Sequence, residues 1–300
     1  MRALVVGRRR KGRPIRQAVR ETAGALEAAG WTVESSVVRK KRELRHEAAQ
    51  AVEAEVDIVV AVGGDGAVLQ VVQAIAEKPV ALGIVPLGTG NLVARNLGIP
   101  KGVEAGVKTL LEGRPRTIDL GLVTLGGEQW FFTVACGVGF DAEVMKATKA
   151  REKDRWGKLA YLANAITESG KVHNVEHLIS LDGVETSMEA AQLFVANFAR
   201  TGLGTEPRLE VKPDDGILDV IAIDAAGPLS GLVAGLRALR QGHFGKGAGG
   251  KALRAQAREI LVTTPKRRHV EVDGSVVGKT PIAVEVRPRA LTAIVPPPTA

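Results

Sequence analysis

Short apolar runs and amphipathic segments alternate along the first 115 residues of this 300-residue chain. The apolar runs are rich in Val and Ile, which is typical of strands that are buried on both faces of a sheet. They are Ala3–Val6, Trp31–Val38, Ile58–Val62 and Val80–Val85. Helical spacing is found at Ile15–Ala29, at Arg42–Glu55, after residues 66 and 91, and at Val103–Leu111. This alternation predicts a doubly wound parallel α/β domain, with its ligand crevice at the carboxyl ends of the strands.

The pattern changes after Arg116, where strand-like segments dominate. The predicted antiparallel strands are Thr117–Val123, Gln129–Cys136, His177–Leu181, Glu185–Phe198, Leu218–Ile223, Glu259–Thr263 and Val270–Val277. Helical segments are predicted among them at Ala142–Thr148, Leu159–Ser169 and Leu229–Arg240. Many short strands with few helices predict a second, β-rich domain that begins near residue 121.

Two glycine-rich turns follow the predicted strands at Ile58–Val62 and Val80–Val85. They are Gly63-Gly64-Asp65-Gly66 and Pro86-Leu87-Gly88-Thr89-Gly90-Asn91. Each turn opens a helix, where unpaired backbone N–H groups and the helix dipole favour a polyphosphate. Either turn alone is weak evidence, because Gly-Gly and Asp-Gly are common turn formers, but the pair favours one phosphate site.

The glycine turns supply the candidate nucleotide ligands. These are Gly63, Gly64, Gly66, Thr89, Gly90 and Asn91. Asp65 would repel phosphates directly, so it is expected to act through Mg²⁺ and water or to order a polar network.

Composition narrows the class of protein. The formal net charge is +8, which favours anionic partners such as a nucleotide or an acidic membrane surface. Aromatic residues make up only 3% of the chain, the basic residues are spread along it, and no nucleic-acid reader motif occurs, so nucleic acid is not expected as a partner. The single cysteine, Cys136, excludes an intrachain disulfide. No apolar run is long enough to span a membrane and no signal peptide is evident, so we expect a cytoplasmic protein that meets lipid only at a surface.

The glycine turns also carry a family resemblance. GGDG followed by PLGTGNLVARNLGIP resembles the catalytic domain of the diacylglycerol kinase family, which includes bacterial lipid kinases and sphingosine kinases. NAD kinases and phosphofructokinases share the GGDG loop alone. The segments FTVACGVGFDAEV and ANFARTGLGTEPRLEVKPDDGILDVIAI resemble the family's second, lipid-holding domain, and the final ALTAIVP resembles its return to the first domain. The resemblance implies a nucleotide-binding domain at 1–120 with 287–300, and a lipid-binding β-sandwich at 121–286.

Asp273 is the base that the resemblance implies. The family's catalytic Asp lies in a DGE segment followed by Pro, which here is Asp273-Gly274-Ser275 followed by Pro281. From the local sequence alone, Asp273-Gly274 is equally typical of a tight hairpin turn, and Asp182-Gly183 has the same pattern without a catalytic role. As the base, Asp273 is expected to face the glycine loops across the interdomain cleft, and Asp182 to face elsewhere.

The KPDDGI segment matches a family loop that binds structural Mg²⁺. The ligands carried over are the Asp215 carboxylate with the carbonyls of Lys212 and Ile217, and the alternative is an acidic turn between strands.

The chain departs from the family pattern in three places. An Asn-Pro-x-Ser-Gly loop is replaced by a basic turn with Arg8, Arg9, Arg10, Lys11 and Arg13. A Thr is replaced by Ala67, and a Glu is replaced by Ser275. The basic turn is either a solvated charge run or an anion contact.

These observations predict a peripheral lipid kinase that uses ATP and Mg²⁺ to phosphorylate a lipid hydroxyl, such as that of diacylglycerol, at an anionic membrane surface. An NAD-kinase-like enzyme with a soluble acceptor is one alternative. The other is a lipid- or nucleotide-binding family member that has lost catalysis. The sequence does not name the lipid, and it leaves a homodimer open.

Overall fold

The computed structural model describes residues 1–12, 14–140, 174–198, 211–223 and 253–298. The helices expected at Ala142–Thr148, Leu159–Ser169 and Leu229–Arg240 lie outside these ranges. The chain divides into two compact units, which we call unit 1 and unit 2. Unit 1 is Met1–Asp119 with Pro288–Ala300, and unit 2 is Leu120–Arg287.

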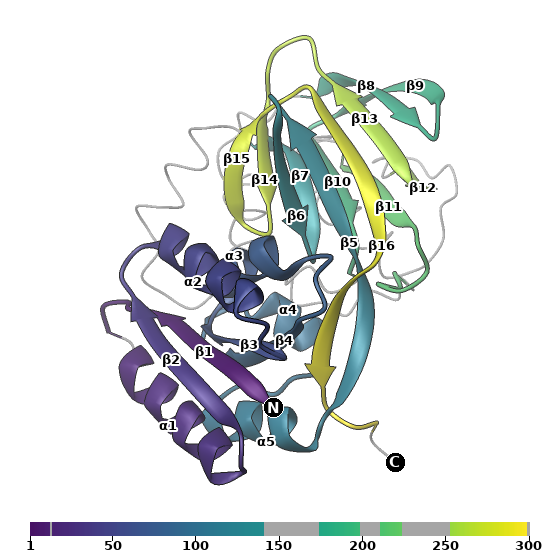
Figure 1. Cartoon of the computed structure of the whole chain (residues 1–300). Coiled ribbons are helices and arrows are strands. Elements are labelled where there is room, and N and C mark those ends of the chain that lie inside the picture. Colours follow the sequence, from purple (N-terminus) through teal and green to yellow (C-terminus); the bar gives the residue numbers. More distant parts are fainter. Residues whose placement is uncertain (13, 141–173, 199–210, 224–252, 299–300) are drawn as a thin grey trace. The chain divides into compact units, whose positions relative to one another are not determined.

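Four parallel strands form the centre of unit 1, in the spatial order β2-β1-β3-β4 (Figure 1). They are β1 (Arg2–Arg8), β2 (Thr32–Val38), β3 (Ile58–Gly63) and β4 (Ala81–Pro86). β1 pairs with β2 from Arg2↔Thr32 onward and with β3 from Ala3↔Ile58 onward. Every residue of β3 is buried, as expected for a central strand of a parallel sheet covered on both faces.

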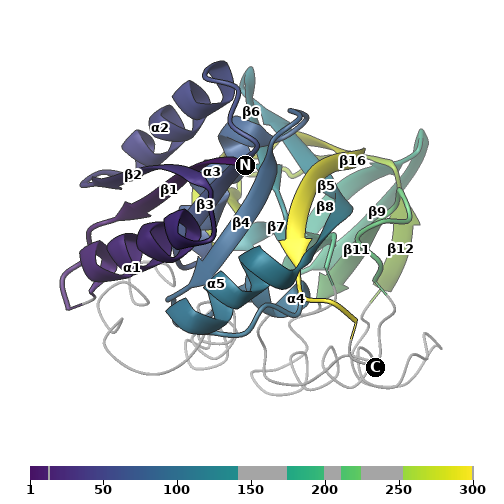
Figure 2. The same ribbon diagram turned by 60° about the horizontal axis from the view of Figure 1, so that its bottom comes forward.

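Helices cover both faces of this sheet. They are α1 (Ile15–Ala28), α2 (Lys41–Glu53), α3 (Asp65–Ile75), α4 (Leu92–Asn96) and α5 (Val103–Glu112). Figure 2 shows α1 and α5 on one face, with α2 and α3 together on the other. Apolar residues of α1, such as Val19 and Leu26, pack with Val5 of β1 and Val60 of β3 in one buried cluster. The predicted doubly wound α/β domain is therefore confirmed.

The last strand of the chain completes the sheet of unit 1. β16 (Ile282–Val295) pairs in parallel with β4 at Thr292↔Ala81 and Ala293↔Leu82. Two further bonds hold it: the N–H of Glu77 donates to the carbonyl of Ala290 at 2.7 Å, and the N–H of Arg289 donates to the carboxylate of buried Asp119 at 2.7 Å. Residues from both ends of the chain thus share one sheet.

Unit 2 consists of antiparallel strands. One sheet has the order β12-β11-β10-β7-β14-β15. Its strands are β12 (Leu253–Ala257), β11 (Leu218–Ile223), β10 (Gln192–Ala196), β7 (Ala135–Phe140), β14 (His269–Val272) and β15 (Ser275–Lys279). In the same unit β8 (Val175–Leu181) lies between β9 (Val184–Ala190) and β13 (Glu259–Thr263), and β13 pairs with the first part of β16. The strands β5 (Arg114–Leu125) and β6 (Glu128–Phe132) form a hairpin. The predicted β-rich C-terminal domain is confirmed.

Three segments of unit 2 that were each predicted as one continuous strand are in fact interrupted. The run 129–136 breaks between β6 and β7 at Thr133-Val134, because these N–H groups bind a carboxylate instead of a neighbouring strand. The run 185–198 breaks at Ala191, where the chain leaves the β8 pairing and joins β7 and β11. The run 270–277 folds back on itself as the hairpin β14–β15. Strand β12 was not predicted.

Within the described ranges, no helix combines the length and the apolar character needed to cross a membrane.

Candidate functional site

Four loops line the edge of the unit 1 sheet where its parallel strands end. In spatial order they follow β2, β1, β3 and β4, so the two glycine loops are neighbours at one half of this edge. The predicted phosphate loops are therefore brought together by the fold. Basic residues occupy the other half, after Arg8 of β1 and after Val38 of β2.

The glycine loops touch each other directly. A Cβ atom placed on Gly64 would lie 2.8 Å from the Cα of Gly88, and one placed on Gly88 would lie 2.6 Å from the Cα of Gly64. Real Cβ atoms do not approach this closely, so both positions need glycine for loop packing alone. A bulky replacement of Gly64 is consequently no clean test of ligand binding, because it would separate the loops.

Asp65 joins the two loops. Its Oδ1 atom accepts a hydrogen bond from the N–H of Val93 in α4 at 3.3 Å, and a Cβ on Gly90 would lie 3.0 Å from its Oδ2 atom. Burial raises the pKa of the Asp65 carboxyl, and the N–H groups of Val93, Leu92 and Asn91 oppose the rise. The carboxylate therefore caps the short helix α4 by accepting from N–H groups of its first turn. Asp65 was expected either to act through Mg²⁺ and water or to order a polar network, and these hydrogen bonds fit the second role.

Asn91 and Thr89 differ in exposure although both belong to the second loop. Asn91 is 6% exposed, has a left-handed φ of 48°, and donates from Nδ2 to the carbonyl of Gly88 at 3.1 Å. Its Oδ1 atom is buried without a hydrogen-bond partner and lies 3.7 Å from the Cβ position of Gly64. Thr89 is exposed. A buried acceptor without a partner is costly, which marks this point as a place for a ligand or water.

Gly66 is the open position of the first loop. Beyond the adjoining residues and the backbone of its own helix, a Cβ on Gly66 would meet Cε and Nζ of Lys41, each at 3.8 Å, within a 4 Å radius of described atoms. Sequence reasoning missed Lys41, which is the first residue of α2 and lies three residues beyond the end of β2. The signal was present: a cation placed just after a parallel strand lies at the ligand edge of the sheet.

Asp273 lies in unit 2, in the turn between β14 and β15. Its Oδ2 atom accepts from the N–H of Thr133 at 2.8 Å and from the hydroxyl of Thr133 at 2.7 Å. Its Oδ1 atom accepts from the N–H groups of Val134 at 2.9 Å and Ala135 at 3.0 Å. Burial raises the pKa of the Asp273 carboxyl, and these four donors oppose the rise. Four donors occupy all the acceptor positions of a carboxylate, so a substrate hydroxyl must displace one of them.

The predicted metal loop lies just before β11. Asp215 is exposed, and its Oδ1 atom accepts from the N–H of Ile217 at 3.1 Å. The metal ligands that the family resemblance implies at Lys212, Asp215 and Ile217 are all oxygen atoms in an accessible turn, which fits a hard cation such as Mg²⁺. Across the described part of the chain, no three His, Cys, Asp or Glu side chains gather as a metal centre.

Two domain families cover most of the sequence. Residues 2–123 match the diacylglycerol kinase catalytic domain, and residues 134–295 match the YegS C-terminal NAD kinase beta sandwich-like domain. The chain belongs to the diacylglycerol kinase family. Membership in this family supports a kinase, and the matches place both glycine loops in the catalytic domain and Asp273 in the C-terminal one.

Individual relatives agree with this assignment. An uncharacterized protein of Synechocystis sp. is 29% identical over 241 residues, which are 79% of this chain and 54% of the relative, so the chain spans about half of that protein. A Pseudomonas syringae protein named as a probable YegS-like lipid kinase is 28% identical over 280 residues, covering 93% of this chain and 88% of its own. A crystal structure of a candidate diacylglycerol kinase from Bacillus anthracis str. Sterne has a TM-score of 0.84 at 22% identity, covering 99% and 95% of the two chains. That structure has the same fold.

Proposed function

We propose that the chain is an ATP-dependent lipid kinase, which transfers the γ-phosphoryl group to a lipid hydroxyl such as that of diacylglycerol. The observation that carries the proposal is the pairing of two glycine loops at the ligand edge of a diacylglycerol kinase catalytic domain. Further support comes from Asp273, the position that the family resemblance assigns to the base, because it is a carboxylate with a raised pKa. A carboxylate of raised pKa is the better proton acceptor near neutral pH.

In the proposed reaction, the acceptor oxygen bonds to the γ-phosphorus as the bond to the β–γ bridging oxygen breaks. ADP leaves, and the proton of the acceptor hydroxyl passes to Asp273. The glycine loops hold the phosphates through backbone N–H groups, with Gly66 presenting the open approach. The hydroxyl of Thr133 gives up its place on Oδ2 of Asp273 to the acceptor hydroxyl. Bound Mg²⁺ would neutralise phosphate charge, and a structural ion would bind at Lys212, Asp215 and Ile217.

We further propose that the enzyme works at the cytoplasmic surface of an anionic membrane without inserting into it. The basic residues that follow β1 and β2 support this, because each Lys or Arg near an anionic leaflet contributes about 1 kcal/mol of binding. Sedimentation with vesicles tests it. Binding is expected to require anionic lipid and to weaken with salt, and equal binding to neutral vesicles would contradict it.

The kinase assignment is tested by supplying γ-labelled ATP with vesicles containing diacylglycerol, and separately with NAD as a soluble acceptor. Label is expected in the lipid fraction after chromatography, and the same assay with Asp273→Asn should lose it. Label in NADP instead would favour the NAD-kinase-like alternative. ATP binding without transfer to any acceptor would favour a family member that has lost catalysis. The four donors on Asp273, with Ala67 and Ser275, are the features that favour that second candidate.

A further inference from the structure

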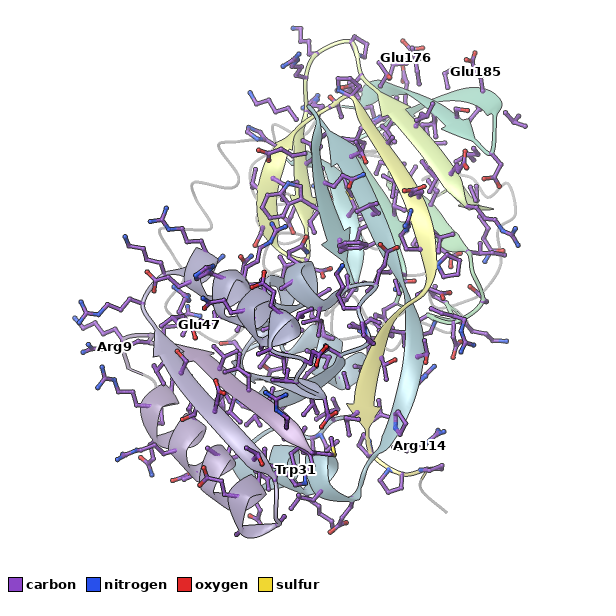
Figure 3. The ribbon with its side chains drawn as sticks, in the orientation of Figure 1. Arg9, Trp31, Glu47, Arg114, Glu176 and Glu185 are labelled. Atoms are coloured by element: carbon purple, nitrogen blue, oxygen red, sulfur yellow. The ribbon has the colours of Figure 1, made fainter. Side chains whose placement is uncertain are left out.

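The fold gathers positive charge at the edge that also carries the glycine loops. Nine cationic residues lie at or just after the ends of β1 and β2, and we call them the basic edge. They are Arg8, Arg9, Arg10, Lys11, Arg39, Lys40, Lys41, Arg42 and Arg45. Arg9 extends outward from the end of β1 in Figure 3. The whole chain has a net charge of +8, so this edge, which is built from two separate stretches of the sequence, accounts for much of its basic character.

Glu43 is a carboxylate within the basic edge, in the first turn of α2. Glu43 directs its Oε2 atom to the N–H groups of Arg39 at 2.9 Å and Lys40 at 3.0 Å. These backbone bonds, the one to Lys40 first, lower the pKa of Glu43. Glu43 is thus an ionised helix cap, and the charges of Lys40 and Arg42 lower its pKa as well. Glu47, one turn further along α2, is the other carboxylate of this part of the helix (Figure 3).

Lys41 is the member of the basic edge that reaches the glycine loops. Apart from the adjoining residues and the backbone of α3 itself, its Cε and Nζ atoms are the described atoms within 4 Å of a Cβ built on Gly66, at 3.8 Å each. The ammonium group therefore stands beside the first turn of α3. Ala67, the next residue, has no polar side-chain group and gives its N–H to the carbonyl of Gly64 at 2.7 Å.

Two helices begin at this point. α2 and α3 pack together on one face of the sheet, and both start at the carboxyl ends of their preceding strands (Figure 2). Their N-terminal dipoles both favour negative charge here. An independent sign of a ligand is the buried Oδ1 atom of Asn91, which has no partner and lies 3.7 Å from the Cβ position of Gly64. An acceptor cannot bind phosphate directly, but it can bind water or an N–H group of a ligand that occupies the loops.

We propose that Lys41 is a phosphate-binding residue, and that its ammonium group and the backbone of Gly66 together hold the terminal phosphates of a nucleoside triphosphate. This inference rests on the proposed function and extends it to a residue outside both glycine loops. A lysine is a compact point charge with three donors, so it matches the most highly charged end of the nucleotide. The neighbouring cations of the basic edge then raise the local concentration of the anion.

The central test is calorimetry of Lys41→Met with ATP, ADP, AMP and adenosine. We expect about a tenfold loss of ATP affinity, a smaller loss as phosphates are removed, and no change for adenosine. Lys108→Met is the matched control. Lys108 is an exposed lysine of α5, 3.8 Å from Glu112, and its removal lowers the net charge equally. ATP affinity equal to that of the unsubstituted protein, or equal losses in both variants, would overturn the inference.

Gly66→Ala gives a second and independent test. The added methyl group has only ordinary contacts with Lys41, and Ala favours a helix more than Gly does. The melting temperature should therefore hold or rise while ATP affinity falls severalfold. A fall in melting temperature with unchanged ATP affinity would contradict close approach of a phosphate to Gly66.

Inorganic tripolyphosphate separates this inference from the proposed function. If the unsubstituted protein binds tripolyphosphate but not ATP, and Lys41→Met weakens that binding, then the phosphate site is supported and the use of ATP is contradicted. If ATP binds and Lys41→Met has no effect, the proposed function is supported and the role of Lys41 is contradicted. If neither anion binds, both are wrong.

Discussion

The hairpins β8–β9 and β14–β15 turn on the same two residue types, Asp182-Gly183 and Asp273-Gly274. Both aspartates are left-handed, with φ of 48° and 43°, and the glycines follow at φ of 85° and 79°. Each aspartate also donates its own N–H to a neighbouring carbonyl, Asp182 to that of Glu259 and Asp273 to that of Ala135. As pieces of backbone the two turns are nearly equivalent.

The turns differ in what their carboxylates bind. Asp182 is exposed, and one of its oxygens, Oδ1, accepts from the N–H groups of Arg258 at 2.9 Å and Glu259 at 2.8 Å. Asp273 uses both oxygens, and one of its four donors is the hydroxyl of buried Thr133. A side-chain donor can rotate away, whereas a backbone donor cannot. Reactivity in such a turn therefore depends on the exchangeable donor and on burial, neither of which the Asp-Gly pair encodes.

The largest expected difference between the turns is in catalysis. Asp273→Asn should lower turnover roughly 10²–10⁴-fold, the range for loss of a positioned general base. Asp182→Asn should leave turnover nearly unchanged. Lipid phosphorylation at saturating ATP measures both variants, and ATP binding, whose candidate groups lie in unit 1, serves as the folding control. Similar activities for the two variants would mean that Asp273 is only a turn residue.

Stability should separate the same pair of variants. In Asp273→Asn, an amide NH₂ group faces two donors of Thr133, and leaving buried donors unsatisfied costs about 1–3 kcal/mol. In Asp182→Asn, the single amide oxygen can still accept both N–H groups, so the change should lie within about 0.5 kcal/mol. Thermal melting of both variants measures the difference. Equal melting temperatures would show that the Thr133 bonds contribute nothing net.

Thr133→Val tests the exchangeable donor through the pH dependence. The hydroxyl of Thr133 lowers the pKa of Asp273 against the rise from burial, so its removal should raise that pKa further. The base acts when ionised. The acidic limb of the pH profile of kcat/KM should therefore move to higher pH, while the plateau value of kcat/KM stays the same. Thr133→Ser retains the hydroxyl and should keep the original limb. Burial raises the pKa of the nearby Cys136 thiol, and the charges of Glu271 and Asp273 add to the rise; Glu271 and Cys136 are unchanged in these variants. An unmoved limb in Thr133→Val would count against the contact.

The smallest effect should be shared by the two turns. Gly183→Ala and Gly274→Ala each place a side chain at positive φ, which costs roughly 1–2 kcal/mol. We expect the two costs to agree within about 0.5 kcal/mol, measured by urea unfolding of both variants side by side. A clearly larger cost at Gly274 would show that the turns are not equivalent as backbone.

Local patterns predicted much of unit 1. The apolar runs that became β1 to β4 and the helical spacing between them depend on neighbouring residues, and the parallel order then placed both glycine loops at one edge. The close contact of Gly64 with Gly88 and the capping of α4 by Asp65 were not predictable, since each joins residues more than 20 positions apart. Lys41 was missed for the same reason, because its neighbour Gly66 is on another helix.

Unit 2 was harder because its signals are long-range. The break at Thr133-Val134 exists because Asp273, 140 residues away, takes the N–H groups that a continuous strand would use. Nothing near Thr133 encodes that partner. The sequence did identify Asp273 as a candidate, through the family's DGE segment, but it gave no means to see its four donors. Asp182 has the same local pattern, which shows that the pattern alone cannot assign the role.

The return of the chain in β16 has a consequence for synthesis on the ribosome. β4 pairs with β3 on one side and, through Ala81 and Leu82, with Thr292 and Ala293 on the other. Roughly 170 residues are translated between the end of the first segment of unit 1 and this closing strand, which takes about 10–30 s at typical rates. For that interval the nascent sheet has an open, apolar edge of the kind that pairs with other chains. A strand that is translated much later thus protects the edge that β4 would otherwise expose.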